Sequence, residues 1–123
     1  IDGLLYPKRG IASLGPLVIK ASAGNVFRAP IIRCDSTAAA VTSLKAKGYQ
    51  VATLEASAKT SLFKFKAADN VICVLGGESG GIGQEVAVLA DARLTIPMAN
   101  SVESLNVAVT AALVSFHLGQ TPD

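Results

Sequence analysis

The sequence has few of the residues from which most metal and redox sites are built. It contains one histidine and two cysteines in 123 residues, and Cys34 and Cys73 stand far apart, with no C-x-x-C pair. Two buried, reduced thiols are therefore favoured over a disulfide or a metal site. His117 follows an apolar segment, which favours a polar residue at a helix end over a catalytic base. No metal site is expected. A cytoplasmic protein, or a mitochondrial or other organellar one in a eukaryote, is favoured.

Long apolar runs and strong net charge are also missing. Val71–Leu75 and Val107–Ala112 are far shorter than the roughly 20 residues that span a bilayer, so no membrane segment is expected. The net charge of +2 is below that of a domain that holds nucleic acid by bulk charge. The densest basic groups, Lys8-Arg9 and Lys64-x-Lys66, are more typical of solvated loops or helix ends than of a phosphate clamp. Half of the residues are hydrophobic, which is enough for one domain to bury a core.

The glycine-rich stretch GGESGGIG, residues 76–83, lacks the features of a phosphate-binding loop. A dinucleotide site needs G-x-G-x-x-G at the start of a helix, and a mononucleotide site needs lysine directly after its last glycine. Ile82 stands where that lysine is required, and Glu78 would repel a phosphate. A dehydrogenase is therefore disfavoured, and the loop is interpreted as serving another ligand.

Apolar runs alternate with helical patterns along the chain. Pro16 and Ser36 are typical helix starts, and Gly48 is a typical stop. Strands are expected at residues 4–6, 30–34, 50–54, 71–75 and 94–96. Helices are expected at residues 16–24, 36–48, 83–90 and 104–118, with a short helical turn at 60–66. This alternation predicts an α/β fold with a mostly parallel sheet and helices on both faces.

Ligands of parallel sheets bind at the carboxyl ends of the strands. Three loops leave such ends, at residues 54–56, 76–82 and 97–103. If the three loops converge, they form one pocket that is lined mostly by backbone groups. The helix that follows the third loop is apolar on all sides, which indicates either a central helix or one shared with a partner.

Two of these loops carry a family resemblance. The segments LGGESGGI (residues 75–82) and IPMANSVESLNVAV (residues 96–109) resemble the second and third signature motifs of the SpoU (TrmH-like) ribose 2'-O-methyltransferases of the SPOUT superfamily. Lys20–Gly24 resembles a helix of that family, and Thr53–Ala56 resembles the strand end that borders its cofactor. The resemblance extends from about Gly3 to Leu118.

The resemblance implies an α/β knot, a C-terminal trefoil knot through which the last helix is threaded. It implies S-adenosyl-L-methionine as cofactor, RNA as partner and a homodimer formed through the knot helix. The catalytic residues that it implies are Glu78, Ser104 and Asn106. The cofactor-binding residues that it implies are Thr53, Leu54, Gly76, Gly77, Ile96, Met98, Ser104, Leu105 and Asn106.

The sequence departs from the family pattern at two places. The first motif, an N-x-G segment followed by an arginine that is thought to act on the ribose or its phosphate, would lie before Ile1. Residues 1–123 are therefore interpreted as a SpoU-type catalytic domain that is incomplete at its N-terminus and inactive alone. Ala108 stands where the family commonly has serine, which removes one hydrogen-bonding group near the cofactor.

Two alternatives concern the RNA substrate and the presence of enzymatic activity. Ribosomal RNA is preferred over transfer RNA, because Lys20–Gly24 and the next strand are closer to that branch. The alternative to an enzyme is a SpoU-like domain that binds RNA or a ribosomal precursor as a scaffold, without turnover.

Overall fold

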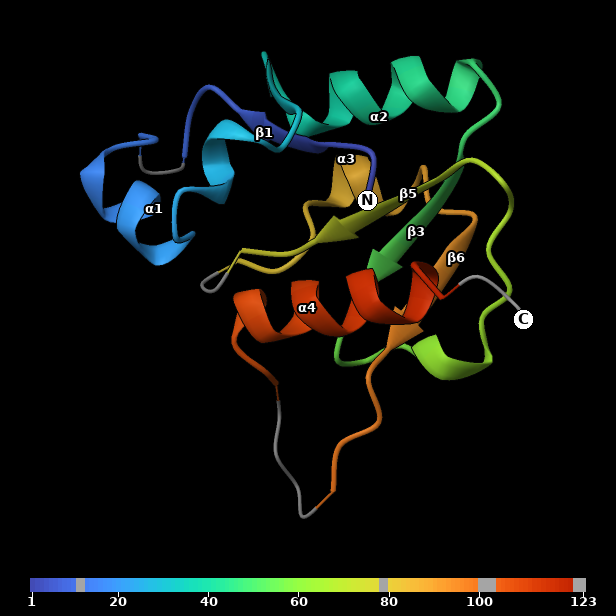
Figure 1. Ribbon diagram of the computed structural model, residues 1–123. Helices are drawn as coiled ribbons and strands as arrows, with labels where there is room; N and C mark the ends of the chain where they lie inside the picture. Colours follow the sequence, from blue (N-terminus) through green and yellow to red (C-terminus); the bar gives the residue numbers. More distant parts are fainter. Residues whose placement is uncertain (11–12, 78–79, 100–103, 121–123) are drawn as a thin grey trace. The chain divides into compact units, whose positions relative to one another are not determined.

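The computed structural model describes residues 1–10, 13–77, 80–99 and 104–120. The chain forms two compact units, which meet in sequence between Ala40 and Val41 (Figure 1). The cavity and all the buried side chains among the described residues belong to the second unit.

The first unit contains a short parallel sheet. Strands β1 (Leu4–Pro7) and β2 (Ile31–Cys34) pair in parallel. Between them lie helix α1 (Pro16–Ala21) and the 3₁₀ helix η1 (Asn25–Phe27). The predicted helix over residues 16–24 ends earlier, because Ala23 and Gly24 take positive φ angles of 50° and 78°.

The second unit contains a four-stranded sheet in the order β4-β6-β3-β5, and every pairing between its strands is parallel. The strands are β3 (Gln50–Leu54), β4 (Thr60–Ser61), β5 (Val71–Leu75) and β6 (Ala92–Thr95). The predicted parallel sheet is confirmed, but the predicted helical turn at residues 60–66 was partly wrong. Strand β4 comes first, and the 3₁₀ helix η2 (Leu62–Lys64) follows it, with the Ser61 hydroxyl accepting from the Phe63 N–H at 3.2 Å.

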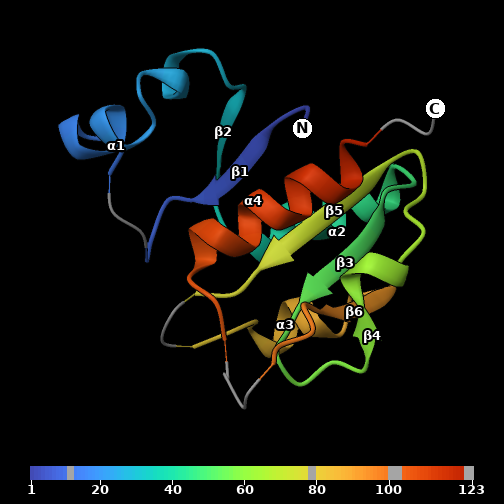
Figure 2. The same ribbon diagram turned by 60° about the horizontal axis from the view of Figure 1, so that its bottom comes forward.

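Helices cover both faces of this sheet. Figures 1 and 2 show α4 (Val107–Leu118) in front of the strands and α3 (Gln84–Ala87) behind them. Ala52 and Leu54 form a buried cluster with Val114 of α4. Because side chains alternate between faces along a strand, Val51 and Thr53 point the other way, and both are fully buried. β3 therefore has a packed layer on each side.

Helix α2 (Thr37–Ala46) lies within the predicted range of 36–48 and ends two residues before Gly48. The Ser36 hydroxyl accepts from the Ala39 N–H at 3.1 Å, and Gly48 takes a φ of 89° after the last turn. Lys45 Nζ donates to Asp91 Oδ1 at 2.6 Å, and Asp91 Oδ2 accepts from the Val51 N–H at 2.8 Å. These contacts fix the start of β3 against the segment that leads into β6.

Helix α4 begins later than predicted. The sequence placed its start at Ser104, but Asn106 is the N-cap, and its Oδ1 accepts from the Ala108 N–H at 2.8 Å. Ser104 and Leu105 therefore remain outside the helix. Within the described ranges, no helix is both long and apolar enough to cross a membrane.

Both cysteines are free thiols and half-buried. Burial raises the pKa of the Cys73 thiol, which keeps it protonated at neutral pH.

Candidate functional site

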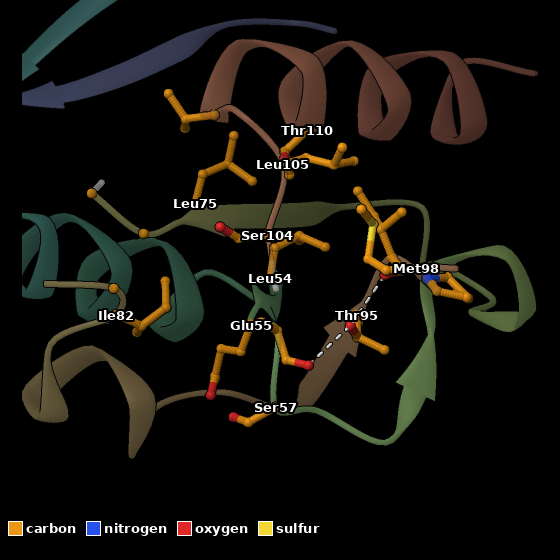
Figure 3. Close-up of a pocket in the computed structure, with 17 residues that line it drawn as sticks. Leu54, Glu55, Ser57, Leu75, Ile82, Thr95, Met98, Ser104, Leu105 and Thr110 are labelled. Carbon is orange, nitrogen blue, oxygen red and sulfur yellow. Dashed lines mark hydrogen bonds between the residues drawn. The ribbon is translucent and has the colours of Figure 1, made fainter. Parts of the chain in front are cut away.

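A cavity of about 790 Å³ lies at the carboxyl ends of β3, β5 and β6 (Figure 3). This volume is in the range of small-molecule sites. Its described lining consists of Leu54, Glu55, Ala56, Ser57, Leu75, Gly76, Gly77, Gly81, Ile82, Thr95, Ile96, Pro97, Met98, Ser104, Leu105, Val107 and Thr110. The predicted convergence of the three strand-end loops on one pocket is confirmed.

The glycine loop closes on itself through its backbone. The Gly77 N–H donates to the Gly81 carbonyl at 3.3 Å, and the Gly81 N–H donates to the Gly77 carbonyl at 3.1 Å. A Cβ added to Gly76 would lie 2.6 Å from the carbonyl carbon of Gly81, closer than such atoms can approach. Gly81 has a φ of 61°, which favours glycine. Glycine is thus required at both positions for the two halves of the loop to meet.

The third loop lines the cavity on both sides of residues 100–103. Ile96, Pro97 and Met98 follow β6, and Ser104 and Leu105 precede α4. Figure 3 shows Ser104, Leu105 and Thr110 on the α4 side of the cavity, with Met98 on the side of β6. The Thr95 hydroxyl donates to the Ala56 carbonyl at 3.4 Å, which ties the first loop to the third.

Glu55 brings a fixed carboxylate to the cavity. Its side chain is only 13% exposed and pairs with Arg93 of β6. Arg93 Nε lies 3.1 Å from Oε1 and 3.2 Å from Oε2, and the Thr53 hydroxyl donates to Oε1 at 2.7 Å. Hydrogen bonds from Arg93, and then from Thr53, lower the pKa of this carboxyl below its ordinary value of 4.5. The side chain is therefore ionised and held in one orientation at neutral pH.

Most of the predicted site residues lie together. Those that line the cavity are Leu54, Gly76, Gly77, Ile96, Met98, Ser104 and Leu105. Thr53 does not line it but is fully buried beneath Glu55, and Asn106 caps α4. Glu78 lies outside the described residues. The catalytic and binding roles of these residues remain predictions.

The sequence interpretation missed several polar residues of the site. Glu55 was assigned to a strand-end loop but not to the site, because its pairing with Arg93 depends on the register of β3 against β6. Thr95 and Thr110 were also missed. Of these residues, only Thr110 could have been found from the sequence. It follows Asn106, a predicted site residue, by four positions and therefore lies on the same side of the helix, one turn later.

Comparison with known proteins identifies the family. The model of the SpoU rRNA methylase family matches residues 1–116. The chain belongs to this family. A protein of Staphylococcus aureus assigned to the TrmH family of tRNA/rRNA methyltransferases is 34% identical over 118 residues, which cover 96% of this chain and 48% of that protein. The chain thus spans about half the length of the curated relatives it matches.

Solved structures of SpoU-type proteins have the same fold. The AdoMet-bound rRNA methyltransferase of Sinorhizobium meliloti aligns with a TM-score of 0.84 and 25% identity, over 94% of this chain and 44% of that one. A structure concerned with the 2-OH methylation of C/U34 on tRNA aligns with a TM-score of 0.73 and 29% identity, over 93% of this chain and 73% of that one.

Replacement of Gly76 by alanine is expected to lower the free energy of unfolding by roughly 1–3 kcal/mol, because the added methyl group forces the loop backbone apart. Urea denaturation measures the change. Gly80→Ala is the matched control, since no atom of the residues that the structure describes, chain neighbours aside, lies within 4 Å of a Cβ at Gly80. Equal stability of the two variants would contradict the close approach between Gly76 and Gly81.

The ion pair of Glu55 predicts a pH dependence of stability. The folded-state pKa lies below 4.5, so its contribution is fully present above pH 4.5 and is lost as the pH falls through the folded-state value. The stability difference between the wild type and Glu55→Gln is therefore expected to shrink below pH 4.5. Denaturant titrations from neutral to acidic pH test this, and a difference that does not change with pH would exclude it.

Proposed function

We propose that residues 1–123 form the catalytic domain of an RNA methyltransferase that transfers a methyl group from S-adenosylmethionine to a ribose 2'-hydroxyl. One observation carries the proposal. The loops that resemble the second and third family motifs line the same cavity, at the edge where parallel sheets bind ligands. Family membership and the AdoMet-bound relative from Sinorhizobium meliloti support the assignment of the cofactor.

The cavity fits an adenosine-containing cofactor in size and in chemistry. Leu54, Ile96, Met98 and Leu105 offer apolar surface for the purine ring. Gly76 and Gly77 carry no side chain, so their backbone groups can approach a ligand closely. S-adenosylmethionine, when bound, supplies a methyl group on a positively charged sulfur.

The protein must orient the ribose hydroxyl in line with that methyl group and accept the hydroxyl proton. Ser104 is proposed to orient reacting groups, because it lies in the cavity just before α4. Asn106 is proposed to act indirectly. Its side chain caps α4 and so fixes the start of the helix, and with it the position of Ser104. Glu78 is proposed to fix loop or partner groups, as the resemblance implies.

Ribosomal RNA is the proposed substrate. The matching family is described as one of rRNA methylases, and the relative from Sinorhizobium meliloti is an rRNA methyltransferase. Transfer RNA is the alternative, because the structure concerned with C/U34 describes methylation of tRNA. A cytoplasmic or organellar location is proposed with this substrate.

Helix α4 is proposed as the knotted helix and as the contact with a second copy of the chain. Val109 and Phe116 are 47% and 71% exposed, and Ala112 lies between them on the same helical face. Apolar stripes of this kind on a surface helix mark interaction sites. Val114, on the opposite face, is buried against the sheet.

The enzymatic proposal predicts that the protein binds S-adenosylmethionine and methylates ribosomal RNA at a ribose 2'-hydroxyl. Asn106→Ala removes the cap of α4 and is expected to reduce both binding and transfer, whereas Asn106→Ser retains a capping oxygen and is expected to retain binding. Calorimetry measures binding, and mass spectrometry of nuclease-digested rRNA and tRNA locates the methyl group. A folded protein that binds RNA but not the cofactor would refute the enzyme and favour the scaffold.

The dimer proposal predicts that Phe116→Glu converts a dimer into a monomer, because it places a charge in the proposed apolar contact. Sedimentation velocity measures the change. Val88→Glu is the control, since Val88 is 69% exposed and lies at the end of α3. A wild type that sediments as a monomer would exclude the dimer.

A further inference from the structure

Glu55 is the one ionisable residue in the described lining of the cavity. The other polar side chains there are the hydroxyls of Ser57, Thr95, Ser104 and Thr110, and the remaining lining is apolar or glycine. A carboxylate accepts hydrogen bonds but does not donate them. Among the described residues, Glu55 is therefore the strongest hydrogen-bond acceptor that a ligand in this cavity meets.

The surroundings of Glu55 fix its position. The Glu55 N–H donates to the Leu94 carbonyl at 2.8 Å, which anchors the backbone to β6. Thr53, whose hydroxyl donates to Oε1, is fully buried, so this donor cannot turn away into solvent. Arg93 approaches from the neighbouring strand, with its Nε near both carboxylate oxygens. These contacts of the Glu55 backbone and carboxylate place the carboxylate in a defined orientation before a ligand binds, which is the condition for a preorganised binding group.

The same contacts indicate which ligand group would suit Glu55. Arg93 already compensates its negative charge, so the pair has no need of a cationic ligand group. Two carboxylate oxygens offer about four acceptor directions, and three donors, the Thr53 hydroxyl and the Nε–H and Nη2–H groups of Arg93, leave about one of them free. Neutral O–H donors match such a site, and acidic residues at strand ends of other nucleotide-binding sheets accept from ribose hydroxyls.

We propose that Glu55 accepts a hydrogen bond from a ribose hydroxyl of the methyl donor and determines specificity for it, with Thr53 and Arg93 as its positioning residues. This inference rests on the proposed function, because it takes an adenosine-containing cofactor as the ligand.

The test compares ligands with and without the ribose hydroxyls. S-adenosylhomocysteine and its 2',3'-dideoxy analogue are titrated by calorimetry into the full-length wild type, Glu55→Gln and the control Glu85→Gln. Glu85 is exposed in α3 and does not line the cavity. Glu55→Gln is expected to weaken S-adenosylhomocysteine on the order of 10- to 100-fold, as for loss of a hydrogen bond to a charged group. The dideoxy analogue is expected to bind the wild type and Glu55→Gln alike.

Thr53→Val provides a second variant that keeps the carboxylate but removes one of its positioning contacts. It is expected to weaken S-adenosylhomocysteine less than Glu55→Gln does, and also to leave the dideoxy analogue unaffected. Equal losses for the two ligands in Glu55→Gln, or no loss for either, would overturn the proposal while the wild type still binds. A wild type that binds neither S-adenosylmethionine nor S-adenosylhomocysteine would refute the proposed function itself.

Discussion

The site depends on the position of β3 between two parallel neighbours. Leu54 pairs with Leu75 of β5 and with Leu94 of β6, so the three strands end within one residue of one another. Val51, Ala52 and Thr53 are completely buried, which makes any slip of this register costly. The residues that follow the strands must therefore emerge side by side, and the cavity is a consequence of that alignment.

Two kinds of contact then shape the cavity from these strand ends. Backbone contact between Gly76 and Gly81 folds the glycine loop tightly, and it tolerates no side chain at Gly76. Side-chain contact between Glu55 and Arg93 fixes one carboxylate at the opening of the first loop. Apolar surface, bare backbone and one oriented acceptor are together what a nucleoside cofactor requires.

Local sequence signals predicted the elements that are long and regular. Val71–Leu75 is an uninterrupted apolar run, and Ser36 and Gly48 delimit a helix by their capping chemistry. Strand β4 has two residues and no alternating pattern, so only its pairing with β6 reveals it. The start of α4 was misplaced because Ser104 and Asn106 are both good capping residues, and it is the Asn106 side chain that caps the helix. The cavity loops were predictable from strand ends, but the role of Glu55 depends on cross-strand register.

A methyl-detected NMR titration with S-adenosylmethionine would show whether the cofactor occupies this cavity. The methyl resonances of Leu54, Ile96 and Met98, which line it, are expected to shift on binding. Those of Val88, which is exposed and outside it, are expected to stay unchanged. Saturating ligand that leaves the cavity methyl groups unshifted, or that shifts only those of Val88, would contradict the location of the cofactor at the carboxyl ends of β3, β5 and β6.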